Sequence, residues 1–249
     1  MVIFQRYASG MDLNARYRAW LHTRRPDLPH FMRGEDVPLD AEYASLGRDK
    51  ASHKGIGRRT ALKELSAHGV NQPFLDEIAG LEGLEYLDLG WPVTATDLAP
   101  LGNLANLRHL EINSPRNIAD FIPLLGLPKL ERLFIENARH LHGLGWLRPL
   151  KDRLVALGIE GSLYTPQPID SLAPLAGFAL EALFLTNTRL ADQDLSPIAT
   201  MPNIRFLGTG LNAPRAQFFA LRDARPGLKC AWFDERAWRD FKDPKPPNR

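Results

Sequence analysis

The sequence predicts an α/β solenoid, in which a unit of one strand and one short return segment repeats along the chain. Three observations predict it: a leucine pattern with a regular period, an alternation of residues inside each unit, and an Asp–Pro pattern between units. The leucine pattern is clearest in "LEGLEYLDLG", "LANLRHLEIN" and "LPKLERLFIE". Its middle leucines are spaced by 23, 23, 24, 26 and 24 residues: Leu87, Leu110, Leu133, Leu157, Leu183 and Leu207. A period of this length is typical of stacked repeats.

The first half of each unit reads as a short strand. In "EYLDLG", Leu87 and Leu89 face one way, whereas Tyr86 and Asp88 face the other. One unit cannot bury its leucines alone, but stacked units form a continuous core. We expect about eight repeats, which begin near Leu62, Leu84, Leu107, Leu130, Leu154, Leu180, Ile204 and Leu228.

The second half of each unit is a return segment, in which an aspartate precedes an apolar turn that contains a proline. Aspartate is a favoured helix N-cap, and proline is tolerated in a first helical turn. The turns are only a few residues long, so we expect 3₁₀ or single-turn helices on the convex side. The predicted capping residues are Asp97, Asp120, Asp170 and Asp194.

The two ends lack the clear pattern and are predicted to be caps. Residues 1–60 form an N-terminal cap that contains an amphipathic helix, "MDLNARYRAWLHTRR", with Leu13, Tyr17, Trp20 and Leu21 on one face. Residues 61–234 form the solenoid, whose last part, "NAPRAQFFALRDARPG", reads as a true helix. Residues 235–249 form a C-terminal cap and a disordered tail, "DPKPPNR". The predicted apolar lid is Trp232, Phe233, Trp238 and Phe241.

The strand pattern "LxxLxxLxL" joined to "DLxPLxxL" resembles the leucine-rich repeat family over about residues 62–234. The nearest variety is the short bacterial repeat of internalins and phosphatase-regulatory repeat proteins. The resemblance implies a right-handed horseshoe with a parallel concave sheet, and a protein that binds other proteins. One departure concerns the asparagine that the family places three residues after the "LxL" leucines. Here those positions hold Pro92, Pro115, Ala138 and Thr188, with Asn137 and Asn187 one place early, so the turns must be satisfied differently.

Outward strand positions on the concave side, which we expect to be exposed to solvent, combine acids with aromatic side chains. Aromatic residues beside charges are typical of binding hot spots, so this face is the candidate binding site, for a protein with a basic surface and an apolar centre. The alternative is that an N- or C-terminal flank folds over the aromatic residues. The candidate partner-binding residues are Tyr86, Asp88, Glu111, Arg132, Phe134, Glu136, Glu160, Phe184, Phe206 and Trp232. The longest unit adds a loop at 161–168 with Leu163, Tyr164 and Pro166, which is either a second binding edge or a tolerated insertion.

No catalytic or metal-binding pattern appears in the sequence. His140 and His142 lack further ligands, and the lone Cys230 lies in an apolar stretch, so we predict a non-enzymatic monomer without cofactor or metal. An enzymatic site in the N-terminal region has only unorganised groups, namely His22, Asp27, His30, Glu35 and Asp36. A weaker alternative is nucleic-acid contact through Arg16, Arg18, Arg24, Arg25, Arg58 and Arg59.

The composition indicates where such a protein works. The net charge of +2 favours no particular partner, and no stretch is apolar enough to span a membrane. We expect a cytoplasmic protein, with secretion that needs no Sec signal left open. An effector delivered to a host and an immunity-type inhibitor are alternative roles for the same face.

Overall fold

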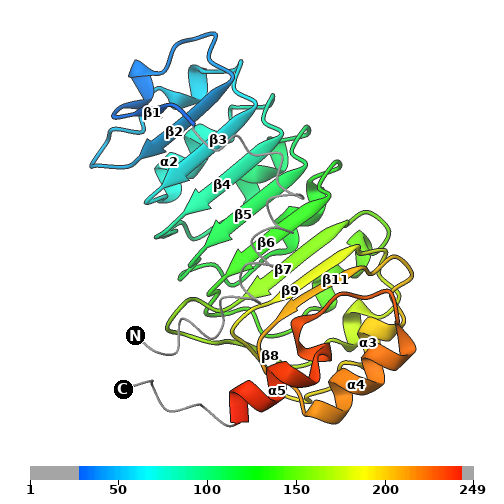
Figure 1. Ribbon diagram of the computed structural model, residues 1–249. Coiled ribbons are helices and arrows are strands. Elements are labelled where there is room, and N and C mark those ends of the chain that lie inside the picture. The colour runs from blue at the N-terminus through cyan, green and yellow to red at the C-terminus, as the bar shows by residue number, and fades with distance from the viewer. Residues whose placement is uncertain (1–27, 243–249) are drawn as a thin grey trace, which may run out of the picture.

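The computed structural model describes residues 28–242, and a nine-stranded parallel sheet in chain order runs through it (Figure 1). Leucines of successive units pair in register, as Leu87 with Leu110 and Leu110 with Leu133. The predicted solenoid is therefore confirmed. The strands are β1 (His30–Phe31), β2 (Tyr43–Gly47), β3 (Glu64–His68), β4 (Tyr86–Gly90), β5 (His109–Asn113), β6 (Arg132–Glu136), β7 (Ala156–Glu160), β9 (Ala182–Leu185) and β11 (Phe206–Thr209).

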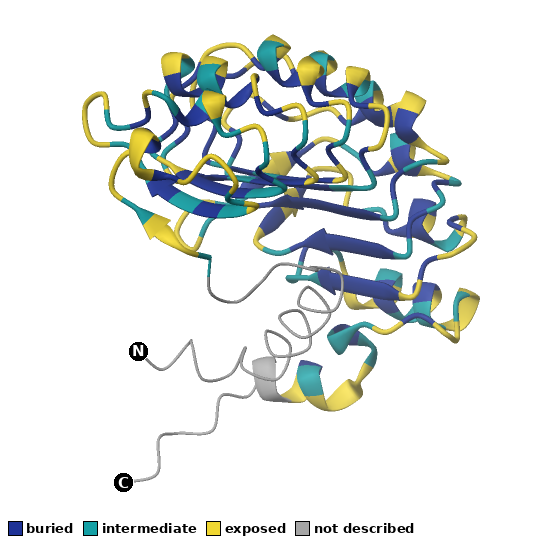
Figure 2. Cartoon of the chain, turned by 90° about the horizontal axis from the view of Figure 1, so that it is seen from above, coloured by how far each residue is buried: buried dark blue, intermediate teal, exposed yellow. Residues whose placement is uncertain are grey.

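Short helices return the chain on the other side of the sheet, as Figure 2 shows from above. They are η1 (Gly34–Asp36), η2 (Ile56–Arg58), α2 (Gln72–Ile78), η3 (Ala99–Asn103), η4 (Ile122–Gly126), η5 (Gly145–Leu150), η6 (Ala173–Leu175) and α3 (Ser196–Ala199). The N-cap positions are Leu98, Phe121 and Leu195, so the prediction that the preceding aspartates are the N-caps was wrong by one residue. From that place Asp97, Asp120 and Asp194 each still accept the backbone N–H two residues later, at 2.8 Å. The prediction for Asp170 was wrong, because the Ser171 hydroxyl accepts from the Ala173 N–H instead.

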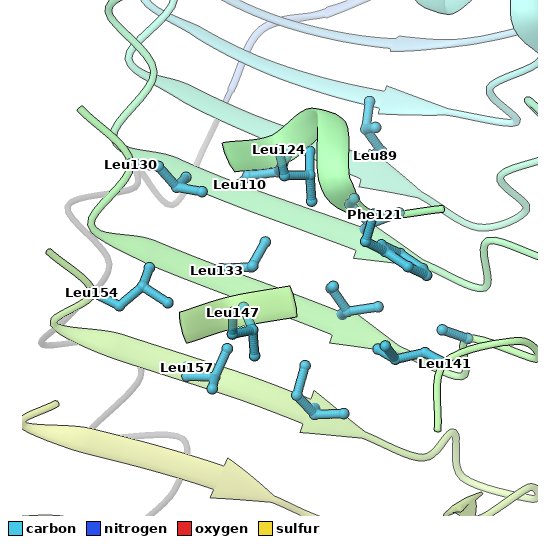
Figure 3. Close-up of a cluster of buried hydrophobic side chains, with 14 of the residues drawn as sticks. Leu89, Leu110, Phe121, Leu124, Leu130, Leu133, Leu141, Leu147, Leu154 and Leu157 are labelled. Atoms are coloured by element: carbon cyan, nitrogen blue, oxygen red, sulfur yellow. The ribbon is translucent and has the colours of Figure 1, made fainter. Parts of the chain in front are cut away.

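The core lies between the sheet and these turns. Leu110, Leu133 and Leu157 of three neighbouring strands are fully buried, and Leu124 and Leu147 of the turns pack beside them (Figure 3). Each aliphatic side chain buried in this way contributes roughly 1.5–3 kcal/mol. The repeat period thus places equivalent leucines in one continuous stack.

The sheet begins earlier than the sequence pattern indicates. β2 pairs with β3 in the common register, with Ala44 beside Leu65 and Leu46 beside Ala67. The prediction that residues 1–60 lack the repeat was therefore wrong for β2 and η2. Ala44 stands where later units have leucine, which hides the unit from a leucine search. The amphipathic helix predicted near residues 11–25 lies outside the described residues.

The C-terminal end differs from a regular unit. The predicted helix is present as α4 (Arg215–Ala224). After it only Lys229 bridges to Phe206, and within the described residues the nine-stranded sheet gains no further strand. Trp232 lies in η7 (Ala231–Phe233), so its predicted place on an outward strand position was wrong. Its ring packs at 5.4 Å from Trp238 of α5 (Glu235–Lys242), as a lid. The tail "DPKPPNR" and the side chain of Phe241 lie outside the described residues.

Glutamine and threonine side chains stabilise the turns where the family's asparagine is absent. The buried Gln167 side chain accepts from the Ala138 N–H at 2.8 Å and donates to the Leu141 carbonyl at 2.6 Å. Thr188 donates its hydroxyl hydrogen to the Ile159 carbonyl at 2.8 Å. These residues lie on a second, two-stranded parallel sheet, formed by β8 (Gln167–Ile169) and β10 (Thr188–Leu190). Asn137, at φ 55°, occupies the left-handed turn position one place earlier.

Candidate protein-binding face

Five aromatic rings form a row across the concave side of the sheet, which we call the aromatic ladder. They come from β4, β5, β6, β9 and β11 and face away from the leucine core. Tyr86 stacks on His109 at 4.3 Å between ring centroids, and His109 on Phe134 at 5.4 Å. Phe184 continues the row at 5.6 Å from Phe134, and Phe206 at 5.4 Å from Phe184. The ladder therefore joins strands that are up to 120 residues apart in sequence, from Tyr86 to Phe206.

Small residues make room for the ladder. β7 lies between β6 and β9 but contributes Gly158, and a Cβ there would lie 2.5 Å from Cδ1 of Phe134. The ring of Phe134 thus occupies the space above β7 and meets Phe184 directly. Ala156 and Ala182 complete this second apolar cluster, separate from the leucine core.

The ladder is buried, which corrects the expectation of solvent-exposed aromatic residues. Tyr86, Phe134 and Phe206 are only 3–5% exposed, and Phe184 is 0% exposed. None of these side chains is without a partner. The alternation of residues along the strands predicts correctly which side of the sheet each aromatic side chain faces. It does not predict whether that side is covered.

Carboxylates border the ladder. Glu111 accepts hydrogen bonds from the Tyr86 hydroxyl at 2.7 Å and from Nε2 of His109 at 3.0 Å. Burial lowers the pKa of His109 below its usual 6.5, while its hydrogen bond to Glu111 partly opposes this shift. Asp88 accepts from the Ser66 hydroxyl at 2.8 Å.

The charge of the outward strand positions is strongly one-sided. From β3 to β11 they carry five acids and one base, a net charge of −4 with histidine neutral. Glu136 lies beside Glu160 in the register of β6 and β7, and Glu160 is buried at 6% exposure. The acids are Glu64, Asp88, Glu111, Glu136 and Glu160, and the base is Arg132.

Comparison with known proteins bears on the fold. No family model and no curated protein matches this chain. The solved structure of the internalin inlF from Listeria monocytogenes has a TM-score of 0.55 at 21% identity, covering 77% of this chain and 54% of that one. A leucine-rich repeat protein of Leptospira interrogans has a TM-score of 0.51 at 16% identity, covering 82% and 58%. Internalin C2 from Listeria monocytogenes has a TM-score of 0.45 at 20% identity, covering 63% and 67%.

The chain has the leucine-rich repeat fold. The resemblance drawn from the strand and return patterns is confirmed at this level. The chain spans about half the length of the internalin inlF, at 54%, and 58% of the Leptospira protein. At these identities the likeness establishes the fold alone.

A second candidate surface of this leucine-rich repeat fold is the loop at the edge where β7 ends. In the loop after β7, Leu163 is 61% exposed and Tyr164 is 89% exposed, whereas Pro166 is half-buried. The expectation that Leu163, Tyr164 and Pro166 stand out from this loop is confirmed for the first two residues and was wrong for Pro166. This loop offers two exposed apolar side chains rather than a continuous row.

The other candidate groups do not assemble into a site within the part of the chain that the structure describes. No three His, Cys, Asp or Glu residues gather there in a metal-binding arrangement, and no helix there has the length and apolar character to cross a bilayer. Burial raises the pKa of the Cys230 thiol to about 12, so it stays protonated at neutral pH. Arg59 donates to the backbone carbonyl of Glu35 at 2.7 Å. His22, Asp27, Arg16, Arg18, Arg24 and Arg25 lie outside the described residues.

Proposed function

We propose that this chain is a non-enzymatic protein-interaction module that binds a protein partner through the concave face. The observation that carries the proposal is the aromatic ladder bordered by acids. Fixed aromatic rings supply apolar contact area at low entropic cost, and aromatic side chains dominate binding hot spots. Carboxylates beside them attract arginine and lysine and disfavour acidic partners.

The chemistry of the face defines the kind of partner. A segment with a row of apolar side chains, flanked by arginine or lysine, matches both the ladder and its acidic border. Hydrogen bonds hold Glu111 and Asp88 in fixed positions, which reduces the entropy lost when a cation binds. A cytoplasmic inhibitor of another protein and a delivered effector would both use the face in this way.

A pull-down from the native cytoplasm tests the proposal. The triple variant Phe134→Ala/Glu136→Ala/Phe184→Ala removes two rings and one acid of the face. We expect it to lose partners that the wild type captures, and we expect those partners to elute as salt screens the charges. A circular-dichroism melt of the variant establishes that it is folded at the temperature of the pull-down.

A second variant separates the face from the loop edge. Leu163→Ala/Tyr164→Ala removes the exposed apolar side chains after β7 and leaves the ladder intact. We expect its partners to equal those of the wild type. If the loop variant loses partners while the triple variant keeps them, the edge is the binding surface and the proposal for the face is wrong.

A further inference from the structure

We propose that residues 1–27 of the same chain occupy the concave face as an internal ligand, which a protein partner must displace. The inference deepens the proposed function, since it names an occupant of the same face. It rests on the burial of the ladder, on charge, on the pattern of residues 1–27 and on length.

The first argument is burial on an otherwise open side of the sheet. Within residues 28–242, the helices lie on the convex side or beyond β11 (Figures 1 and 2). The ladder nevertheless keeps Phe184 at 0% and Phe134 at 5% exposure. Stacking between neighbouring rings covers their sides, but full burial requires further cover from above the sheet. The proposed occupant, residues 1–27, would supply such cover.

The second argument is charge. Residues 1–27 contain five arginines, no lysine and two aspartates, a net charge of +3. The outward positions of the sheet carry −4. Two surfaces of opposite charge attract each other, and the attraction is strongest where water is excluded. The arginines are Arg6, Arg16, Arg18, Arg24 and Arg25.

The third argument is the pattern within the segment. In a helix over residues 11–25, Leu13, Tyr17, Trp20 and Leu21 form one apolar stripe. Arg16 lies on one side of this stripe, Arg18 and Arg25 lie on the other, and Arg24 lies within the stripe in its last turn. The segment is thus the kind of partner that the face selects, with an apolar centre and basic borders.

The fourth argument is length. Fifteen helical residues span about 22 Å, and the five strand spacings from β4 to β11 span about 24 Å. The described chain begins at Leu28 beside β1, three spacings or about 14 Å from β4. The residues that join Arg25 to Leu28 reach about 10 Å, so a helix that ends at Arg25 begins to cover the sheet close to the ladder.

Residues 243–249 do not fit the face. The segment "DPKPPNR" has one lysine, one arginine and one aspartate, and its only apolar residues are prolines. It has no aromatic or aliphatic side chain to place on the ladder. A second copy of the chain remains as an outcome of the experiment below.

Hydrogen exchange of the full chain, followed by mass spectrometry, tests the inference. We expect amides of residues 11–25 to exchange at least about tenfold more slowly than an unstructured chain. The variant Glu111→Lys/Glu136→Lys reverses the charge of the face, so its protection should fall close to the unstructured rate. The matched control Glu82→Lys/Asp152→Lys makes the same charge change at exposed sites off the strands and should keep the wild-type protection.

A second variant covers the case in which charge reversal unfolds the sheet. Tyr17→Ala/Trp20→Ala leaves every residue of the sheet unchanged and raises helix propensity. If the helix forms without docking on the sheet, the amides of residues 11–25 should stay protected in this variant. If the helix is held by contacts of Tyr17 and Trp20 with the ladder, the variant should lose that protection. In the same variant, hydroxyl-radical labelling of Phe134 and Phe184 should rise severalfold.

Three results would overturn the inference. They are unprotected amides over residues 11–25 in the wild type, protection that survives both variants, and protection that appears only as protein concentration rises, which would identify a second copy. The outcome is separate from that of the pull-down. Face-dependent protection without captured partners would refute the proposed function alone, and face-dependent capture without protection would refute the internal ligand alone.

Discussion

Gly158 controls how the two halves of the aromatic ladder meet, and Gly158→Ala perturbs that contact with a single carbon. The new Cβ would lie 2.5 Å from Cδ1 of Phe134 and 3.0 Å from Oε2 of Glu160. The Phe134 ring cannot swing aside freely, because His109 stacks on one side of it and Phe184 packs on the other. Forcing a methyl group into such a site costs about 1–3 kcal/mol.

Gly47→Ala is the matched control. Gly47 is also a strand glycine, but a Cβ there meets nothing within 4 Å. Removing the freedom of glycine in the unfolded chain should stabilise this variant by about 0.4–1 kcal/mol. In a chain of this length, 1 kcal/mol corresponds to about 2–4 °C in Tm. Calorimetry should show Gly158→Ala lower by roughly 2–12 °C and Gly47→Ala level or higher. Equal melting temperatures for the two variants would show that the ladder is not packed as described.

Three further predictions concern the core, a turn and pH. Leu133→Ala and Leu183→Ala should each lose about 2–5 kcal/mol in urea unfolding, while the exposed Leu163→Ala should change by less than about 0.5 kcal/mol. Gln167→Leu leaves buried backbone groups of Ala138 and Leu141 without partners, so each should cost about 1–3 kcal/mol in the same assay. The pKa of His109 is lowered in the folded chain, so as pH falls this histidine binds a proton in the unfolded chain first. The free energy of unfolding should therefore be highest above about pH 6.5 and decrease below it. His109→Gln should flatten this decrease, leaving a residual slope from His53, whose pKa is also lowered by burial. An unchanged slope would contradict the burial of His109.

The leucine period was sufficient to predict the strands from β3 to β7, β9 and β11 and their register, because stacking requires equivalent residues to meet. Tyr86, His109 and Arg132 pair across three strands as their spacing predicts. The unit containing Ala44 was missed, since its backbone pairs like the others but its core side chain is small. Ala44 is nevertheless fully buried beside Leu65, and a search for leucine does not detect such a unit.

The candidate site was predicted less completely. Alternation in the strands predicted the facing of Phe134 and Phe184, but it carries no information about what packs above them. The role of Gly158 was also missed, although a glycine among bulky outward residues is a signal of close packing. Trp232 was assigned to a strand because its spacing continued the period, whereas the chain had already turned into η7.

The two edges of the nine-stranded sheet are built in a way that hinders the addition of further strands. A parallel sheet with a free edge invites another strand, and stacked repeats could then join end to end into filaments. At one edge, β1 has only two residues. At the other, the indole N–H of Trp232 donates to the Thr209 carbonyl at 2.8 Å, a hydrogen bond that an added strand would otherwise make. Both features disfavour the pairing of a further strand, and hence growth of the sheet into filaments, at its two edges.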